Sequence, residues 1–288
     1  MSDREPADTE PASRQYGRRA FLGAAAGAAL TAAACSAEGT PGASSSTRAG
    51  ASGSTTAATA APSAGPQTST AAAPATPARA PRPALLSAPG PDITNGPRTR
   101  EEVGLTFHGQ GPEALTRRVL AECRAADAGI TVFAVGAWLA ANPGLGRAIV
   151  AAGHELGNHT WSHQQMPQLD AGQAAEEVAR GAAALEAAVG SAGWWFRPSG
   201  TPHSTATIRA AALKSGYQRC ISYDVDPEDY RDPGAALVRT RTRRHARPGS
   251  IISLHLGHAG TVQALPGILS DLSTAGLRPV TLSVLLRD

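Results

Sequence analysis

Apolar positions change their period repeatedly along the C-terminal two thirds of the chain. Short apolar runs that suit buried strands alternate with stretches in which apolar residues recur every three to four positions, as in amphipathic helices. The predicted strands are 103–107, 130–135, 155–158, 194–196, 219–223, 250–254 and 279–284. The predicted helices are 112–127, 138–152 with a break at Asn142-Pro143, a helix capped by Asp170 that ends at Val189, 204–215, 234–245 and 261–274.

This alternation predicts an α/β protein built on a parallel sheet, either open or closed into a barrel. The segment that carries the alternation, residues 101–288, is 188 residues long. A full eightfold barrel typically needs about 250 residues. We therefore expect a distorted (β/α) barrel of about seven parallel strands.

The preceding part of the chain has a different composition. Between residues 39 and 81, only Arg48, Gln67 and Arg79 fall outside Ala, Gly, Pro, Ser and Thr. Such a tract has almost no bulky apolar side chains to bury, so it cannot offset the entropy lost on ordering. We expect residues 36–100 to be a disordered linker and residues 101–288 to be the single folded domain.

Residues 1–35 read as a signal peptide. The pair Arg18-Arg19 precedes an apolar run of about 14 residues from Phe21 to Ala34, which is too short to span a bilayer. The arginine pair resembles a twin-arginine export signal, and an ordinary secretory signal is the alternative. Ala32 to Cys35 resembles a lipobox, which predicts a lipoprotein on the outer face of the cytoplasmic membrane. Cleavage at an A-x-A site would instead release a secreted protein.

The remaining cysteines, Cys123 and Cys220, fall in a predicted helix and a predicted strand. We expect two buried, unpaired thiols rather than a disulfide.

Charge narrows the range of partners. The net charge of +3 belongs to residues 1–100, which hold nine Arg and six acidic residues, whereas residues 101–288 hold 17 basic and 17 acidic residues. A neutral folded domain does not indicate nucleic-acid binding. We expect a monomer that contacts the membrane only through its N-terminal lipid.

Candidate chemistry clusters directly after the predicted strands, at His108, His159, His163, Arg197, the acidic run 224–229, His255 and His258. The carboxyl ends of parallel strands meet at one face, where α/β proteins carry their active sites. Two histidines four residues apart, such as His159 and His163, suit a zinc ion. Each feature alone also fits an ordinary surface loop, but their order after successive strands is specific.

Taken together, these residues resemble the polysaccharide deacetylases, the NodB-homology domain of family 4 carbohydrate esterases. The resemblance covers residues 101–288 and rests on 105–107 with Gly111-Pro112, 153–163, 196–198, 226–230 and 252–255. It implies a distorted barrel and metal-dependent removal of N-acetyl groups from peptidoglycan or chitin-like polymers. The sequence does not separate N- from O-deacetylation.

The resemblance also implies roles for single residues. His159 and His163 correspond to ligands of a divalent metal, expected to be zinc, and His255 to the general acid that protonates the leaving amine. Arg197 and Asp229 correspond to residues that orient the base and the acid. Tyr230 stands where the family prefers Trp.

One departure affects this assignment. The family carries two adjacent Asp after Thr-Phe, one as base and one as third ligand, whereas this chain has His108-Gly109-Gln110. His108 replaces the ligand, or it replaces the base, or the site is inactive. Asp224 or Asp226 is a candidate for the missing carboxylate. The expected function is therefore an N-deacetylase, and the alternative is a non-catalytic glycan-binding pseudoenzyme tethered at the cell envelope.

Overall fold

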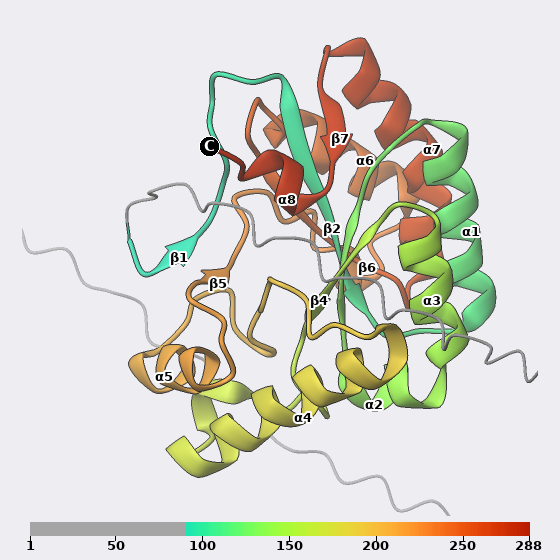
Figure 1. Cartoon of the computed structure of the whole chain (residues 1–288). Helices are drawn as coiled ribbons and strands as arrows, with labels where there is room; N and C mark the ends of the chain where they lie inside the picture. The colour runs from blue at the N-terminus through green and yellow to red at the C-terminus, as the bar shows by residue number, and fades with distance from the viewer. Residues whose placement is uncertain (1–89) are drawn as a thin grey trace, which may run out of the picture. The chain divides into compact units, whose positions relative to one another are not determined.

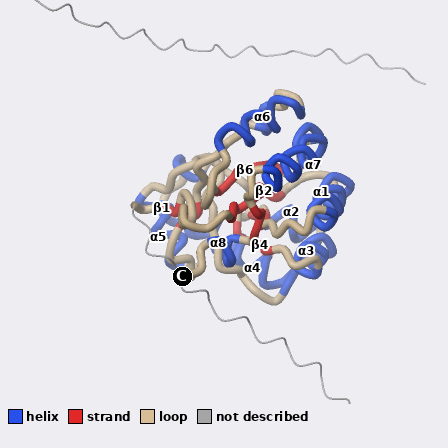
Figure 2. The backbone as a smooth tube through the Cα atoms, turned by 90° about the horizontal axis from the view of Figure 1, so that it is seen from above, coloured by secondary structure: helices blue, strands red, loops and turns tan. Residues whose placement is uncertain are grey.

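The computed structural model describes residues 90–288 as a ring of parallel strands with helices around it (Figures 1 and 2). The seven strands are β1 (Asp92–Ile93), β2 (Glu102–Gly109), β3 (Thr131–Ala134), β4 (Glu155–Asn158), β5 (Cys220–Ile221), β6 (Ile251–His255) and β7 (Arg278–Val280). Four of them are neighbours in the order β4-β3-β2-β6, and β7 pairs with the start of β2. All pairings between these strands are parallel.

Two segments, one on each side of α5 (Ala206–Lys214), close the ring. Phe196 is bridged to Asn158 of β4 on one side and to Cys220 of β5 on the other. Five residues beyond Cys220, Val225 is bridged to Ile252 of β6. The expected distorted (β/α) barrel of about seven parallel strands is confirmed.

The helices pack outside the strands. They are α1 (Glu113–Ala125), α2 (Gly136–Ala141), α3 (Pro143–Ala151), α4 (Ala171–Val189), α5 (Ala206–Lys214), α6 (Ala235–His245), α7 (Ala259–Thr274) and α8 (Leu282–Leu285), with short 3₁₀ turns η1 (Met166–Gln168) and η2 (Asp229–Arg231). The predicted break falls between α2 and α3, where Pro143 starts the second helix. Asp170 caps α4 by accepting hydrogen bonds from the backbone N–H groups of Gly172 and Gln173.

The structure corrects three expectations. The fold begins ahead of residue 101, because Asp92 and Ile93 are buried and pair with β5. The predicted strand 194–196 is reduced to the bridges of Phe196. The predicted strand 279–284 ends at Val280, and Leu282–Leu285 form α8 instead. Apolar periodicity cannot separate these two states over so few residues, and the packing of Leu282 and Leu285 against Ile93 and Ile251 favours the helix.

Cys123 and Cys220 are buried and unpaired, as predicted. No helix within residues 90–288 is long and apolar enough to cross a membrane. The predictions for residues 1–35 and for most of the linker concern residues outside the described range 90–288.

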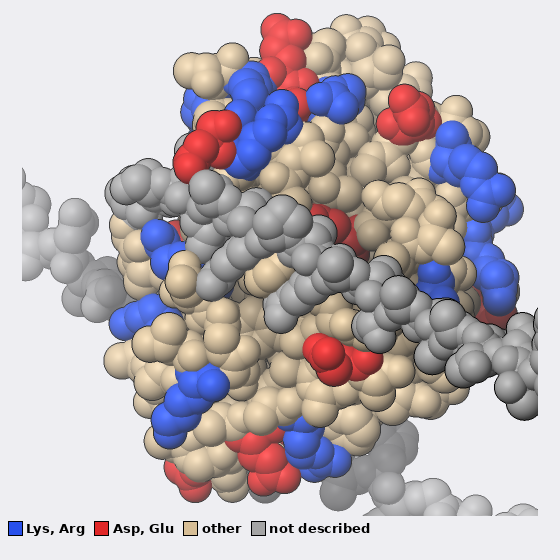
Figure 3. Space-filling view, in the orientation of Figure 1, with Lys and Arg blue, Asp and Glu red and all other residues tan. Residues whose placement is uncertain are grey.

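Basic and acidic side chains are interspersed on the face that Figure 3 shows. The buried carboxylate of Glu102, at the start of β2, forms ion pairs with Arg100, Arg278 and Arg287.

Candidate metal and catalytic site

Parallel strands bring four histidines to one end of the barrel. His108 lies near the end of β2 and is the direct register partner of His255 at the end of β6, so the two side chains point to the same face. Their rings stack with centroids 4.3 Å apart and planes 20° apart. His159 follows β4 directly, and its ring centroid lies 4.5 Å from that of His108.

His108, His159 and His163 form a compact group of nitrogen donors. Their candidate ligand atoms all lie within 4.8 Å of one another. The Nδ1 atom of His159 lies 2.8 Å from the carbonyl oxygen of Arg197. Since a carbonyl only accepts, this nitrogen carries the proton, and the Nε2 nitrogen is left unprotonated, with a lone pair that can accept a hydrogen bond or bind a metal ion. That Nε2 atom faces Nδ1 of His108 at 2.8 Å.

The three imidazoles are held in the neutral form that binds metals. Burial, followed by the neighbouring imidazoles, lowers the pKa of His108 well below 6.5, and burial lowers those of His159 and His163 as well. Nitrogens at about 2.0–2.1 Å around a tetrahedral zinc ion lie about 3.4 Å apart. The spread of these donor atoms brackets that separation, so the donor set fits a zinc-type ion.

His255, which is partly exposed, and Asp229, which is buried, form a hydrogen-bonded pair beside this group. The Asp229 carboxylate lies 2.7 Å from Nδ1 of His255 and accepts hydrogen bonds from the His255 backbone N–H at 2.7 Å and from the Thr261 hydroxyl at 2.6 Å. Asp229 therefore fixes the orientation of the His255 ring. The other ring nitrogen, Nε2, remains for a substrate.

Arg197 is buried and donates mainly to the backbone. Its guanidinium donates to the carbonyl oxygens of Ile221 (3.2 Å) and Ser222 (2.9 Å) and to the Thr106 hydroxyl (2.9 Å). Burial lowers its pKa to about 9. Its Nη1 atom lies 3.4 Å from Nε2 of His108, so the structure places Arg197 at His108 rather than at His255.

The two candidate carboxylates fall in different places. Asp224 accepts hydrogen bonds from Arg98 at 2.6 Å and from the backbone N–H of Ile251 at 2.8 Å, and it lines no hollow at the histidines. Asp226 lines the same hollow as His108 and His255, and burial raises its pKa. Of these two carboxylates, Asp226 is therefore the one placed to act on a substrate.

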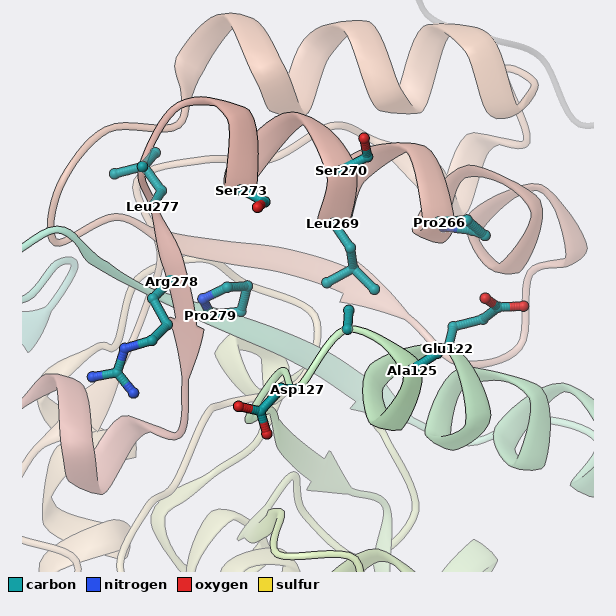
Figure 4. Close-up of a pocket in the computed structure, with 12 residues that line it drawn as sticks. Glu122, Ala125, Asp127, Pro266, Leu269, Ser270, Ser273, Leu277, Arg278 and Pro279 are labelled. Atoms are coloured by element: carbon teal, nitrogen blue, oxygen red, sulfur yellow. The ribbon is translucent and has the colours of Figure 1, made fainter.

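Two adjoining hollows open at the histidines. One of about 320 Å³ is lined by His108, His163, His255, Asp226, Tyr223 and Tyr230, and one of about 240 Å³ by His108, His159, His163, His255, Tyr230 and His258. They share His108, His163, His255 and Tyr230. A larger cavity of about 630 Å³ lies between α1, α7 and β7, at the opposite end of the strands (Figure 4). Its floor is apolar, with Leu269 and Pro279, and it contains none of the residues predicted for the site.

Two residues at the site escape prediction from the sequence. The hydroxyl of Ser253 lies 2.9 Å from Nε2 of His108. Glu177 of α4 is buried and binds the segment that carries His163. The sequence holds one signal for Glu177, because it lies at helical spacing from Ala174, Val178 and Gly181 on the buried face of α4. A charged residue at such a position indicates a buried partner.

Comparison with known proteins identifies relatives of this chain. The family model for polysaccharide deacetylase matches residues 95–220. A peptidoglycan-N-acetylglucosamine deacetylase from Bacillus cereus is 31% identical over 195 residues, which cover 66% of this chain and 91% of that protein. A longer deacetylase of the same description, from Listeria monocytogenes, is 27% identical, and this chain covers 39% of its length.

Solved structures with this fold include active and inactive proteins. A family 4 carbohydrate esterase from Streptomyces lividans in complex with acetate is 33% identical, with a TM-score of 0.57 and coverage of 62% of this chain and 91% of that one. A CE4 family pseudoenzyme from Bacillus anthracis is 26% identical, with a TM-score of 0.64 and coverage of 68% and 69%. A mutant of that pseudoenzyme with restored enzymatic activity has the same TM-score.

Proposed function

The chain belongs to the polysaccharide deacetylase family, and from that premise we propose that it hydrolyses N-acetyl groups of N-acetylglucosamine in peptidoglycan. One observation carries this proposal: three histidines converge beside His255, which is hydrogen-bonded to the buried carboxylate of Asp229. The Bacillus cereus relative, whose length this chain covers almost fully, supports the choice of substrate.

We assign the metal to His108, His159 and His163, with zinc as the ion. Three protein ligands and one open position are the pattern of catalytic zinc sites. An ion held there supplies Lewis acidity toward the acetamide carbonyl and toward a water molecule. His108 is assigned as the third ligand rather than the base, because its ring offers a nitrogen within 4.8 Å of the candidate ligand atoms of both His159 and His163.

The protein's own groups then carry the proton transfers. Asp226 takes the proton of the attacking water, since its carboxyl lines the hollow and burial raises its pKa. His255 gives a proton from Nε2 to the departing amine, while Asp229 holds Nδ1 and stabilises the charged ring. Arg197 holds His108 in place and adds positive charge near it.

The test is metal content together with acetate release from peptidoglycan, chitin oligomers and O-acetylated glycans. We expect purified wild-type protein to bind zinc and to release acetate from the N-acetylated glycans. The variant His108→Ala should lose both properties. Wild-type activity in His108→Ala would overturn the assignment of His108.

A second candidate is a glycan-binding protein without activity. The observation that favours it is the match to a pseudoenzyme in a chain that lacks the two adjacent Asp of the first motif. A protein that binds glycan, holds no metal and releases no acetate would be that binder.

We further propose that the enzyme works outside the cytoplasm as a monomer tethered by its N-terminus. The support is the sequence: an arginine pair, an apolar run and Cys35 in a lipobox-like context, followed by a Pro-, Ser- and Ala-rich tract. A lipid mass on Cys35 and its loss in Cys35→Ala would support the anchor. A soluble, unlipidated product would instead indicate secretion.

A further inference from the structure

The segment that carries His163 has an unfavourable backbone. Thr160 and His163 both adopt left-handed conformations, with φ of 69° and 60°. This region is unfavourable for residues with a Cβ, and most of all for β-branched residues such as Thr. A backbone of this kind persists only where surrounding contacts hold it.

One carboxylate supplies four of those contacts. Glu177 accepts hydrogen bonds from the backbone N–H groups of Trp161 (3.1 Å) and Ser162 (2.9 Å). It also accepts from the Ser162 hydroxyl at 2.7 Å and from the Gln164 amide at 3.1 Å. All four donors lie between His159 and Gln165, so the carboxylate binds the whole turn between the two metal-binding histidines.

The helix that presents Glu177 is docked tightly on the same segment. A Cβ at Gly181, one turn further along α4, would lie 3.0 Å from the backbone carbon of Thr160. Arg180 lies over the ring of Trp161, 4.3 Å from its centroid. The position of Glu177 relative to the turn is therefore set by close packing as well as by hydrogen bonds.

We propose that Glu177 is a positioning residue for the metal centre, holding the 160–163 turn so that His163 faces His108 and His159. The inference rests on the proposed metal-dependent function. Glu177 lines neither hollow, so it acts only through the turn.

The first test compares Glu177→Gln with Glu176→Gln. Glu176 is exposed on the same helix and bonds only Arg180 among the residues described, so it is the matched control. An amide cannot accept from all four donors, and loss of a partner that orients metal ligands typically weakens metal affinity about 10–100-fold. We expect that loss in a zinc titration of Glu177→Gln, an altered Co²⁺ absorption spectrum, and wild-type behaviour in Glu176→Gln.

Three measurements guard against a simple folding defect. Ser162 is exposed, so Ser162→Ala should fold normally while losing one of the four hydrogen bonds, and we expect it to weaken zinc binding by several-fold. The double variant Ser162→Ala/Glu177→Gln should lose less affinity than the product of the single losses, because both act through one network. In metal-free protein, hydrogen exchange at the Trp161 and Ser162 amides should accelerate in Glu177→Gln.

The outcomes separate the two proposals. Absence of zinc binding by the wild-type protein would overturn the proposed function and this inference together. Measurable wild-type binding with unchanged affinity and Co²⁺ spectrum in Glu177→Gln and Ser162→Ala would overturn this inference alone.

Discussion

The two ends of the barrel strands use buried polar groups in different ways. At the carboxyl end, His108, His159 and His255 bond to neighbours but line open hollows. At the opposite end, Glu102 is enclosed by three arginines, and His154 is buried with no partner for either ring nitrogen among the described residues. A cavity of about 630 Å³, larger than either hollow at the histidines, lies at this second end, yet it is mostly apolar (Figure 4).

The difference teaches that cavity size is a poor guide to chemistry in this protein. A reaction needs donors, acceptors and protonation states directed at an accessible space, and only the carboxyl end combines them. At the other end the buried Glu102 carboxylate is paired with arginines within the fold, so it contributes to stability rather than to a reaction.

Replacing one histidine at each end is the sharpest way to test the contrast. We expect His159→Ala to lose zinc binding and to lower acetate release at least about 10³-fold, because several kcal/mol of transition-state stabilisation disappear with the metal. His154→Ala should keep zinc binding and activity while folded. Equal losses of activity in both variants would contradict the assignment of the two ends.

Asp229→Asn tests the proposed general acid, His255, separately from the metal site. We expect kcat to fall by about 10²-fold with zinc affinity unchanged, because the amide no longer stabilises a charged His255. Asp271→Asn is the control, since that carboxylate is bonded to Arg239 on the surface between α6 and α7. Loss of zinc in Asp229→Asn would place Asp229 in the metal site instead.

Glu102→Gln tests whether the buried carboxylate at the amino end of the strands contributes to stability. Removing the one acid among three arginines should lower the free energy of unfolding by about 2 kcal/mol, since the arginines are partly exposed and only the carboxylate is buried. Thermal unfolding would report a midpoint lower by roughly 4–8 °C. Activity per folded molecule should not change, and a loss of kcat would show that the two ends are coupled.

The smallest effect is the pH dependence that His154 adds to stability. Burial lowers the pKa of His154 below 6.5 in the folded state, so the unfolded chain takes up a proton that the folded chain excludes. Stability is then complete above pH 6.5 and declines as the pH falls below it. Unfolding midpoints of metal-free wild type should drop more between about pH 7.5 and about pH 5.5 than those of His154→Phe. If the unfolding midpoints of wild type and His154→Phe changed equally with pH, the folded protein would tolerate a charged His154 ring, and the prediction would be wrong.

Much of the fold was predictable because its signals are local. The apolar runs at β2 and β3 and the capping residue Asp170 specify elements without reference to the rest of the chain. The short elements were not predictable. The two-residue strand β1 and the helix α8 exist through their contacts with β5 and the surrounding core, which local periodicity does not record.

The candidate site divides in the same way. The histidines and Asp229 were found from their positions after strands and from the resemblance to a family. The choice between Asp224 and Asp226 required the structure. Although they are only two positions apart, Asp224 is bonded to Arg98, whereas Asp226 lines the hollow at the histidines. Glu177 lies 14 residues beyond His163, and only the docking of α4 brings it to the turn.

The amino-acid sequence by itself determined the succession of strands and helices, the residue types available for chemistry and the absence of the two adjacent Asp after Phe107. These properties depend on neighbours within a few positions along the chain. The tertiary structure alone decided that His108 faces His159, that Arg197 lies at His108, and that Glu177 holds the 160–163 turn. Those contacts join residues up to 89 positions apart, and their distances are set by strand register and helix packing.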